Sequence, residues 1–142
     1  MKILNILTPK RLIGNLGERA AARYLKRRGY KILERNYVNS GHEIDIIARK
    51  NSITVFIEVK TRTVGHQDPR EPRPASSVNA TKQKAIIETA RRYLSAHRTE
   101  SRKRFDIIEV YTEYTGKKYI IKDIRHLENT FNINTAYTPY KK

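Results

Sequence analysis

Residues 41–60 read GHEIDIIARKNSITVFIEVK, and the predicted fold is built outward from this stretch. Two segments, residues 42–49 and 52–60, are rich in Ile and Val, which are common in β-strands. The residues at their junction, Lys50-Asn51-Ser52, are typical of a turn. The pattern predicts a β-hairpin around which the remaining chain is arranged.

The hairpin carries charged side chains at spacings of two residues. Because successive side chains of a strand alternate between its faces, Glu43 and Asp45 share one face of the first strand. For the same reason, Glu58 and Lys60 share one face of the second strand. Pairing of the strands brings Asp45 against Glu58 if the register allows it. Three carboxylates and a lysine would then converge on one patch.

This patch has a physical cost that suggests a ligand. Carboxylates directly opposite one another on a sheet repel, at a cost of up to about 1 kcal/mol. Lys60 offsets part of this repulsion, and a divalent cation offsets it fully, because Mg²⁺ binds one or two carboxylates, water and phosphate oxygens. Such an ion activates water and stabilises charge on a phosphate, which is the chemistry of phosphodiester cleavage. The alternative is an amphipathic hairpin with a charged solvent face. Glu-x-Asp, a turn and Glu-x-Lys together favour the metal site.

The chain is strongly basic. Its 142 residues, enough for one domain with a sizeable core, include 30 Lys and Arg against 14 Asp and Glu, a formal net charge of +16. This excess predicts a polyanionic partner, with nucleic acid as the leading candidate and a membrane surface as the alternative. No apolar run approaches the roughly 20 residues that span a bilayer, and the apolar start is too short for a secretory signal. We therefore expect a cytoplasmic protein with no membrane partner.

Several chemistries are disfavoured by composition. The absence of cysteine excludes disulfides and thiolate-bound zinc. The four histidines have no metal-ligand spacing, and no glycine-rich phosphate loop is present. Nucleotide-dependent chemistry is therefore not expected.

A helix is predicted over residues 9–28, with Gly29 as its stop, because apolar residues recur at spacings of three and four. Glu18 lies within its basic stretch, where an intrahelical ion pair with Arg11 or Arg23 is one explanation. The basic face either lies along a phosphate backbone or is an ordinary solvated surface. It consists of Lys10, Arg11, Arg19, Arg23, Lys26 and Arg27.

A second helix, capped by Asn79 or Ser77, is predicted to run to about Ala96. Lys82 falls in its first turns, where a cation is mildly disfavoured by the helix dipole. This position indicates either an anion nearby or an ordinary surface lysine.

The remaining segments complete a single α/β domain over residues 1–142, with a core at about 9–126. A proline-rich loop at residues 64–77 is either functional or disordered. Residues 127–142 lack periodicity and predict a flexible tail. The order αβββαββ describes a mixed central sheet flanked by helices. Besides the hairpin, the predicted strands are residues 30–38, 105–112 and 118–125.

Five blocks carry a family resemblance: GNLGERAAARYLKRRGYKILERNYV, GHEIDIIA, VFIEVKTR, TKQKAIIETARRYL and RFDIIEV. In this order they resemble the YraN family of small bacterial proteins, which are similar to archaeal Holliday junction resolvases and to the restriction-endonuclease-like fold. The resemblance covers residues 12–131. It implies a three-layer domain with a metal-dependent nuclease core built on an Asp followed by Glu-x-Lys.

Position by position, the resemblance implies roles for the acidic patch. Asp45 and Glu58 are expected to bind Mg²⁺ or Mn²⁺, with the Val59 carbonyl as a third ligand. Lys60 corresponds to the catalytic lysine. Glu18 matches the helix carboxylate that resolvases add to this cluster, which makes a role beyond an ion pair the favoured interpretation.

The resemblance also covers positions around this core. Lys82 matches a basic position that contacts substrate phosphate. Glu43 belongs to a Gly-Gly-Glu-Ile-Asp block and is an auxiliary candidate, and His42 stands where that block has its second glycine, so the backbone there is less free. Further nucleic-acid contacts are expected from Arg19, Arg23 and Arg62.

Two functions fit these residues. The first is a Mg²⁺-dependent endonuclease acting on DNA, selective for branched DNA, and the second is a non-catalytic nucleic-acid-binding module that keeps the nuclease fold. The intact set of Asp45, Glu58 and Lys60 favours the enzyme, because a pure binder gains nothing from acids that face phosphates. A third reading, a basic adaptor for an acidic protein, has no dedicated motif. The resemblance to dimeric resolvases adds a homodimer as an expectation.

Overall fold

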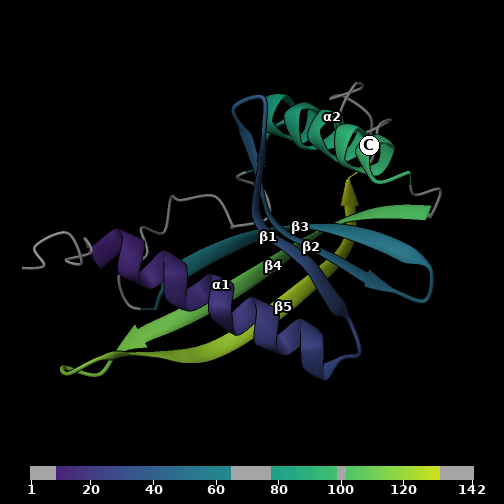
Figure 1. Ribbon diagram of the computed structural model, residues 1–142. Coiled ribbons are helices and arrows are strands. Elements are labelled where there is room, and N and C mark those ends of the chain that lie inside the picture. The colour runs from purple at the N-terminus through teal and green to yellow at the C-terminus, as the bar shows by residue number, and fades with distance from the viewer. Residues whose placement is uncertain (1–8, 65–77, 99–101, 132–142) are drawn as a thin grey trace, which may run out of the picture.

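The computed structural model describes residues 9–64, 78–98 and 102–131 (Figure 1). These residues form two helices and five strands in the predicted order αβββαββ. The α/β class predicted from the sequence is therefore confirmed, and the architecture is consistent with a restriction-endonuclease-like fold. The elements are α1 (Pro9–Arg27), β1 (Lys31–Asn39), β2 (His42–Lys50), β3 (Ile53–Thr63), α2 (Ala80–Ala96), β4 (Arg102–Tyr114) and β5 (Tyr119–Phe131).

The strands form one mixed sheet in the order β1-β2-β3-β4-β5. Only β3 and β4 run parallel, because the chain crosses between them through α2, whereas the other neighbours are antiparallel. Figure 1 shows α1 lying along one face of the sheet and α2 at the other side, near the upper end of the β1–β2 hairpin. The result is a helix–sheet–helix arrangement in three layers.

Each face of the sheet has its own apolar core. Alternation along β3 divides its side chains between the two, so that Val55 and Ile57 pack under α1 and Phe56 packs under α2. The α1 core includes Ala21 and Leu25, both fully buried. Because β3 is buried on both faces, it reads as a nearly continuous apolar run rather than an alternating one.

The predicted β2–β3 hairpin is confirmed, and its register places the acids as expected. Pairing runs from Lys50 opposite Ile53 to Ile46 opposite Ile57, where the ladder ends. Asn51 and Ser52 form the turn with φ angles of 51° and 65°, values typical of a tight hairpin turn. Beyond the last pair, β2 separates from β3 and continues beside β1 toward α2.

The helix ends follow the capping signals in the sequence. The Asn79 side chain accepts a hydrogen bond from the Lys82 amide at 2.9 Å, so Asn79 is the N-cap of α2. After α1, Gly29 takes a φ of 89°, which confirms it as the stop. Neither helix in the described ranges is long and apolar enough to cross a bilayer.

The end of β5 differs from the prediction. The strand continues to Phe131, whose buried ring stacks on Phe105 with centroids 5.2 Å apart. The flexible tail predicted from residue 127 was therefore wrong for residues 127–131, and residues 132–142 lie outside the described part. Most of the loop predicted at residues 64–77 also lies outside it.

A buried polar cluster links β4 to the last residues of β5 and to the segment after α1. Asp106 is fully buried and accepts two hydrogen bonds from Arg104, at 2.9 and 2.8 Å. His126 Nε2 lies 2.7 Å from the same carboxylate, and the Asn129 amide donates to it at 2.9 Å. Burial alone would raise the pKa of Asp106, but the hydrogen bonds from His126, Arg104 and Asn129 and the charge of Arg104 together outweigh burial and lower that pKa. Arg104 also donates to the Tyr30 hydroxyl at 2.7 Å, which ties β4 to the segment after α1.

Candidate active site

Asp45 lies where β2 leaves β3. Its Oδ2 accepts a hydrogen bond from the Val59 amide at 2.8 Å. The β2–β3 ladder ends at Ile46, the residue that follows Asp45 in the sequence. The aspartate side chain therefore takes the place of a backbone acceptor for the Val59 amide. The split between the strands therefore holds the Asp45 carboxylate beside the backbone of β3.

Glu58 is the buried acid of the site. It is 7% exposed, and its Oε2 lies 2.6 Å from Lys82 Nζ and 3.5 Å from Lys60 Nζ. Lys60 follows two residues later on the same face of β3, whereas Lys82 reaches in from the first turn of α2. In the sequence, the position of Lys82 in the first turns of a helix indicated either a nearby anion or an ordinary surface lysine. The structure shows an anion, Glu58.

The charges in this cluster shift one another's pKa values. Burial raises the pKa of Asp45 to about 7, and the negative charge of Glu58 adds to the rise, against the opposing hydrogen bond from Val59. Burial lowers the pKa of Lys60, with Lys82 contributing and Glu58 opposing. Burial alone would lower the pKa of Lys82, but its hydrogen bond to Glu58 and the negative charge of Glu58, with smaller contributions from Lys60 and Asp45, together outweigh burial and raise that pKa. Glu58 has the ammonium groups of Lys60 and Lys82 within 3.5 Å, and the charge of Asp45 also contributes to the raised pKa of Lys82.

Glu18 reaches the edge of the cluster from α1. The preceding residue, Gly17, is buried against β3, where an added Cβ would collide with the Thr61 hydroxyl. This close approach sets α1 against the strand that carries Lys60. Glu18 Oε1 accepts a hydrogen bond from Asn36 Nδ2 at 2.9 Å, and its charge contributes to the raised pKa of Asp45.

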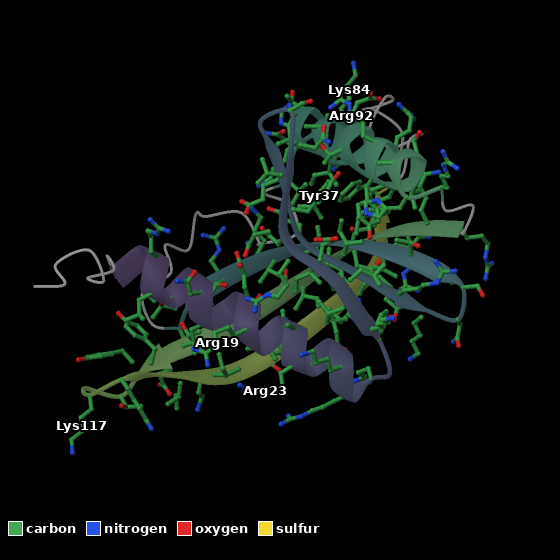
Figure 2. The ribbon with its side chains drawn as sticks, viewed as in Figure 1. Arg19, Arg23, Tyr37, Lys84, Arg92 and Lys117 are labelled. Atoms are coloured by element: carbon green, nitrogen blue, oxygen red, sulfur yellow. The ribbon has the colours of Figure 1, made fainter. Side chains whose placement is uncertain are left out.

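The other predicted residues lie farther out. Glu43 is exposed, and its charge makes the smallest contribution to the raised pKa of Asp45. Arg19 and Arg23 are exposed on α1 (Figure 2), and Arg62 is half-buried on β3 beyond Lys60. The structure thus brings together Asp45, Glu58, Lys60 and Lys82, with Glu18 at the edge.

Two residues near the site were missed in the sequence. Asn36, on β1, donates the hydrogen bond to Glu18 and has a backbone φ of 52°. No sequence pattern marks this residue. Glu109 is 4% exposed on β4, directly across the β3–β4 pair from Lys60. It accepts a hydrogen bond from the Tyr111 hydroxyl at 3.0 Å. An acid inside the apolar run FDIIEV was the available signal.

The oxygen atoms of this site suit a hard cation that takes few ligands from the protein. No group of three or more Asp, Glu, His or Cys side chains in the described ranges is placed to hold a metal ion. The ligands expected from the sequence were Asp45, Glu58 and the Val59 carbonyl, and two carboxylates would match the one or two that Mg²⁺ usually takes from a protein. Burial is the largest cause of the raised pKa of Asp45, and the negative charge of Glu58 adds to it; a cation bound here would favour the ionised carboxylate against both effects. Lys82 neutralises Glu58 in this structure.

The fold and this cluster define a three-layer α/β protein in which an aspartate and a Glu-x-Lys pair meet at the split between two strands. The chain belongs to the uncharacterised protein family UPF0102, whose model matches residues 17–110. This is the YraN family that the five sequence blocks resemble. That range contains Glu18, Asp45, Glu58, Lys60 and Lys82.

Three UPF0102 proteins illustrate the similarity. The protein from Geobacter metallireducens is 40% identical over 122 residues, which are 85% of this chain and 93% of the relative. The protein from Acetivibrio thermocellus is 42% identical over 126 residues, covering 86% and 92%. The protein from Alkaliphilus oremlandii is 43% identical over 122 residues, covering 84% and 97%. The family therefore extends over most of the chain.

Proposed function

We propose that this protein binds nucleic acid and is a metal-dependent endonuclease that hydrolyses DNA phosphodiester bonds, with selectivity for branched DNA. The observation that carries the proposal is the Asp45 carboxylate, whose pKa is raised to about 7 beside the buried Glu58 and the Glu-x-Lys lysine. The formal net charge of +16 supports a polyanionic substrate. DNA, Mg²⁺ or Mn²⁺, a cytoplasmic location and a homodimer are all parts of this proposal.

Asp45 and Glu58, with the Val59 carbonyl, would hold the divalent cation. When bound, such an ion supplies Lewis-acid activation of the phosphate and lowers the pKa of a water molecule. Asp45 is held for this role by the Val59 amide, which fixes one carboxylate oxygen and leaves the other for a ligand. Burial of Glu58 keeps solvent from competing at its oxygens.

Lys60 and Lys82 have different roles in this mechanism. Lys60, whose pKa is lowered by burial, gives up a proton more readily than a surface lysine and would orient the attacking water. Lys82 pairs with Glu58, and with a cation on that carboxylate its ammonium group would be available to the substrate phosphate. Glu18, fixed by Asn36, assists from the α1 side by orienting water near Asp45. Arg19, Arg23 and Arg62 supply backbone contacts around this centre.

A non-catalytic nucleic-acid-binding module is the second candidate. It is favoured by the ion pair of Lys82 with Glu58 at 2.6 Å, which already neutralises one of the two expected ligands. It is also favoured by the lack of a third acidic ligand among the described residues. In that case the acids would only orient the lysines.

Cleavage of labelled linear, flapped, single-stranded and four-way-junction DNA, with Mg²⁺, Mn²⁺ or EDTA, separates the two candidates. The test variants are Asp45→Asn and Lys60→Met. The matched controls are Asp123→Asn and Lys103→Met, which change exposed residues on β5 and β4.

For the endonuclease, we expect metal-dependent cutting that each test substitution lowers at least about 100-fold, the scale of a lost acid–base catalyst. DNA binding should persist in the test variants, and the controls should cut normally. Tight, salt-sensitive binding with no cutting under any metal would establish the binding module instead.

A further inference from the structure

A groove of about 680 Å³ lies beside the candidate active site. Its lining comes from the N-terminal half of α1, the middle of β1 and the turn between β4 and β5. Glu18 and Asn36, at the edge of the catalytic cluster, are part of this lining. The groove therefore shares Glu18 and its partner Asn36 with the edge of the proposed reaction centre.

The lining combines positive charge with aromatic surface. Four basic side chains, Arg19, Arg35, Lys117 and Lys118, face one acidic side chain. Tyr114 and Tyr119 lie on opposite strands of the β4–β5 hairpin with ring centroids 4.9 Å apart, and Tyr114 is 49% exposed. Figure 2 shows Arg19 on α1 and Lys117 at the hairpin tip. A half-exposed aromatic ring among cations offers a flat apolar face beside groups that bind phosphate.

The hairpin tip is rigidly built. The Thr115 amide donates to the Lys118 carbonyl at 2.8 Å, and the Thr115 hydroxyl accepts from the Lys118 amide at 3.3 Å. Gly116 takes a φ of 95°, which suits glycine at this turn. Lys117 and Lys118 are therefore presented at fixed backbone positions beside Tyr114.

We propose that this groove binds a single-stranded segment of nucleic acid next to the cleavage site, with one base stacked on Tyr114. Every base has a flat face that stacks on an aromatic ring, and a basic groove follows the phosphates, which is how proteins hold single strands without reading sequence. The volume is that of a site for a small ligand, enough for one or two nucleotides and too small for a double helix. In a duplex the base faces are covered by their neighbours, so Tyr114 discriminates in favour of unpaired bases.

This inference rests on the proposed function for its polyanionic partner and adds the form of the substrate. A nuclease that holds an unpaired strand at its reaction centre acts where duplex and single strand meet, as in a flap or an open branch. Tyr114 and Tyr119 lie beyond residues 17–110, the range that the family model matches, whereas Glu18, Arg19, Arg35 and Asn36 lie within it.

The test is DNA binding in EDTA, where no cleavage occurs. Fluorescein-labelled blunt duplex is compared with the same duplex carrying a single-stranded flap, and a 2-aminopurine base in the flap reports stacking through its quenched fluorescence. Tyr114→Leu removes the ring, and Tyr114→Phe retains it. Lys117→Gln tests the charge, with Lys103→Gln, an exposed lysine outside the groove, as its control.

We expect Tyr114→Leu to weaken binding of the flapped DNA about tenfold, which lies within the range for stacking one base on one ring. It should also restore 2-aminopurine fluorescence and leave blunt-duplex binding unchanged, whereas Tyr114→Phe should behave as the unmodified protein. Lys117→Gln should weaken flap binding more than Lys103→Gln does. This comparison tests the groove even if Tyr114→Leu folds poorly.

Two negative results are distinguishable. If the unmodified protein binds blunt and flapped DNA equally, and Tyr114→Leu and Lys117→Gln change neither, the groove proposal is overturned while nucleic-acid binding stands. If no DNA is bound at low salt, both this inference and the proposed function are overturned.

Discussion

Asp45→Asn is predicted to stabilise the metal-free protein while removing its proposed metal site. The substitution keeps an oxygen that accepts the hydrogen bond from the Val59 amide and removes the charge. Burial and the nearby Glu58 raise the pKa of Asp45 from 3.8 to about 7. A carboxylate with a raised pKa binds its proton more tightly in the folded state, so its ionisation above pH 7 works against folding.

The magnitude follows from this shift. A rise of about three pKa units corresponds to about 4 kcal/mol as an upper limit, at 1.36 kcal/mol per unit. Asp45 is only half-buried and solvent screens its charge, so we expect a gain of about 1–2 kcal/mol at pH 8. For a chain of this size that corresponds to a rise in Tm of about 3–8 °C. The gain should fade as pH drops from about 7 toward 4, because Asp45 in the unmodified protein then becomes neutral.

Thermal unfolding followed by circular dichroism, in EDTA at pH 8 and pH 5, measures this gain. Asp123→Asn, an exposed residue on β5, is the control and should change Tm little at either pH. Adding millimolar Mn²⁺ should raise the Tm of the unmodified protein, since a ligand of the folded state stabilises it, and should leave Asp45→Asn unchanged. The reasoning is refuted if Asp45→Asn lowers Tm at pH 8, or if its gain is the same at pH 5.

Two further predictions concern packing and can be measured by urea denaturation. Gly17→Ala should destabilise the fold by about 1–3 kcal/mol, because its Cβ would collide with Thr61, whereas Gly14→Ala, which meets nothing within 4 Å, should stabilise α1 by about 0.5–1 kcal/mol. Equal effects of the two substitutions would contradict the close contact of α1 with β3. Arg104→Met should cost about 3 kcal/mol, because it removes the guanidinium that donates two hydrogen bonds to the fully buried Asp106. A loss below about 1 kcal/mol would show that this cluster does not stabilise the fold.

The β2–β3 hairpin was predictable because its signals are local. Alternating Ile and Val and the turn at Asn51 and Ser52 determine which residues pair, and the observed register is the one that directs Asp45 toward Glu58. The end of the ladder at Ile46 was not predictable. It depends on β2 bending away with β1 toward α2, which is a property of the assembled sheet.

The outer parts of the site depend on tertiary contacts that leave no periodic pattern. Glu18 reaches the cluster only because Gly17 packs against Thr61, a residue far along the chain, and because Asn36 turns toward it from β1. The end of β5 was missed for a similar reason, since Phe131 is held by Phe105 rather than by a strand pattern of its own. Charge spacing and the hairpin register identified Asp45 and Glu58, whereas the approach of Glu18 depended on tertiary packing.

The central claim is that Asp45 and Glu58 form one divalent-cation site at the split between β2 and β3. Anomalous diffraction from crystals grown with Mn²⁺ tests it most directly. We predict a manganese peak between the two carboxylates, close to the Val59 carbonyl, with Lys82 moved away from Glu58, and no peak in crystals of Asp45→Asn. The claim would be contradicted if crystals of the unmodified protein at saturating Mn²⁺ showed no peak at this position and Lys82 still bound to Glu58.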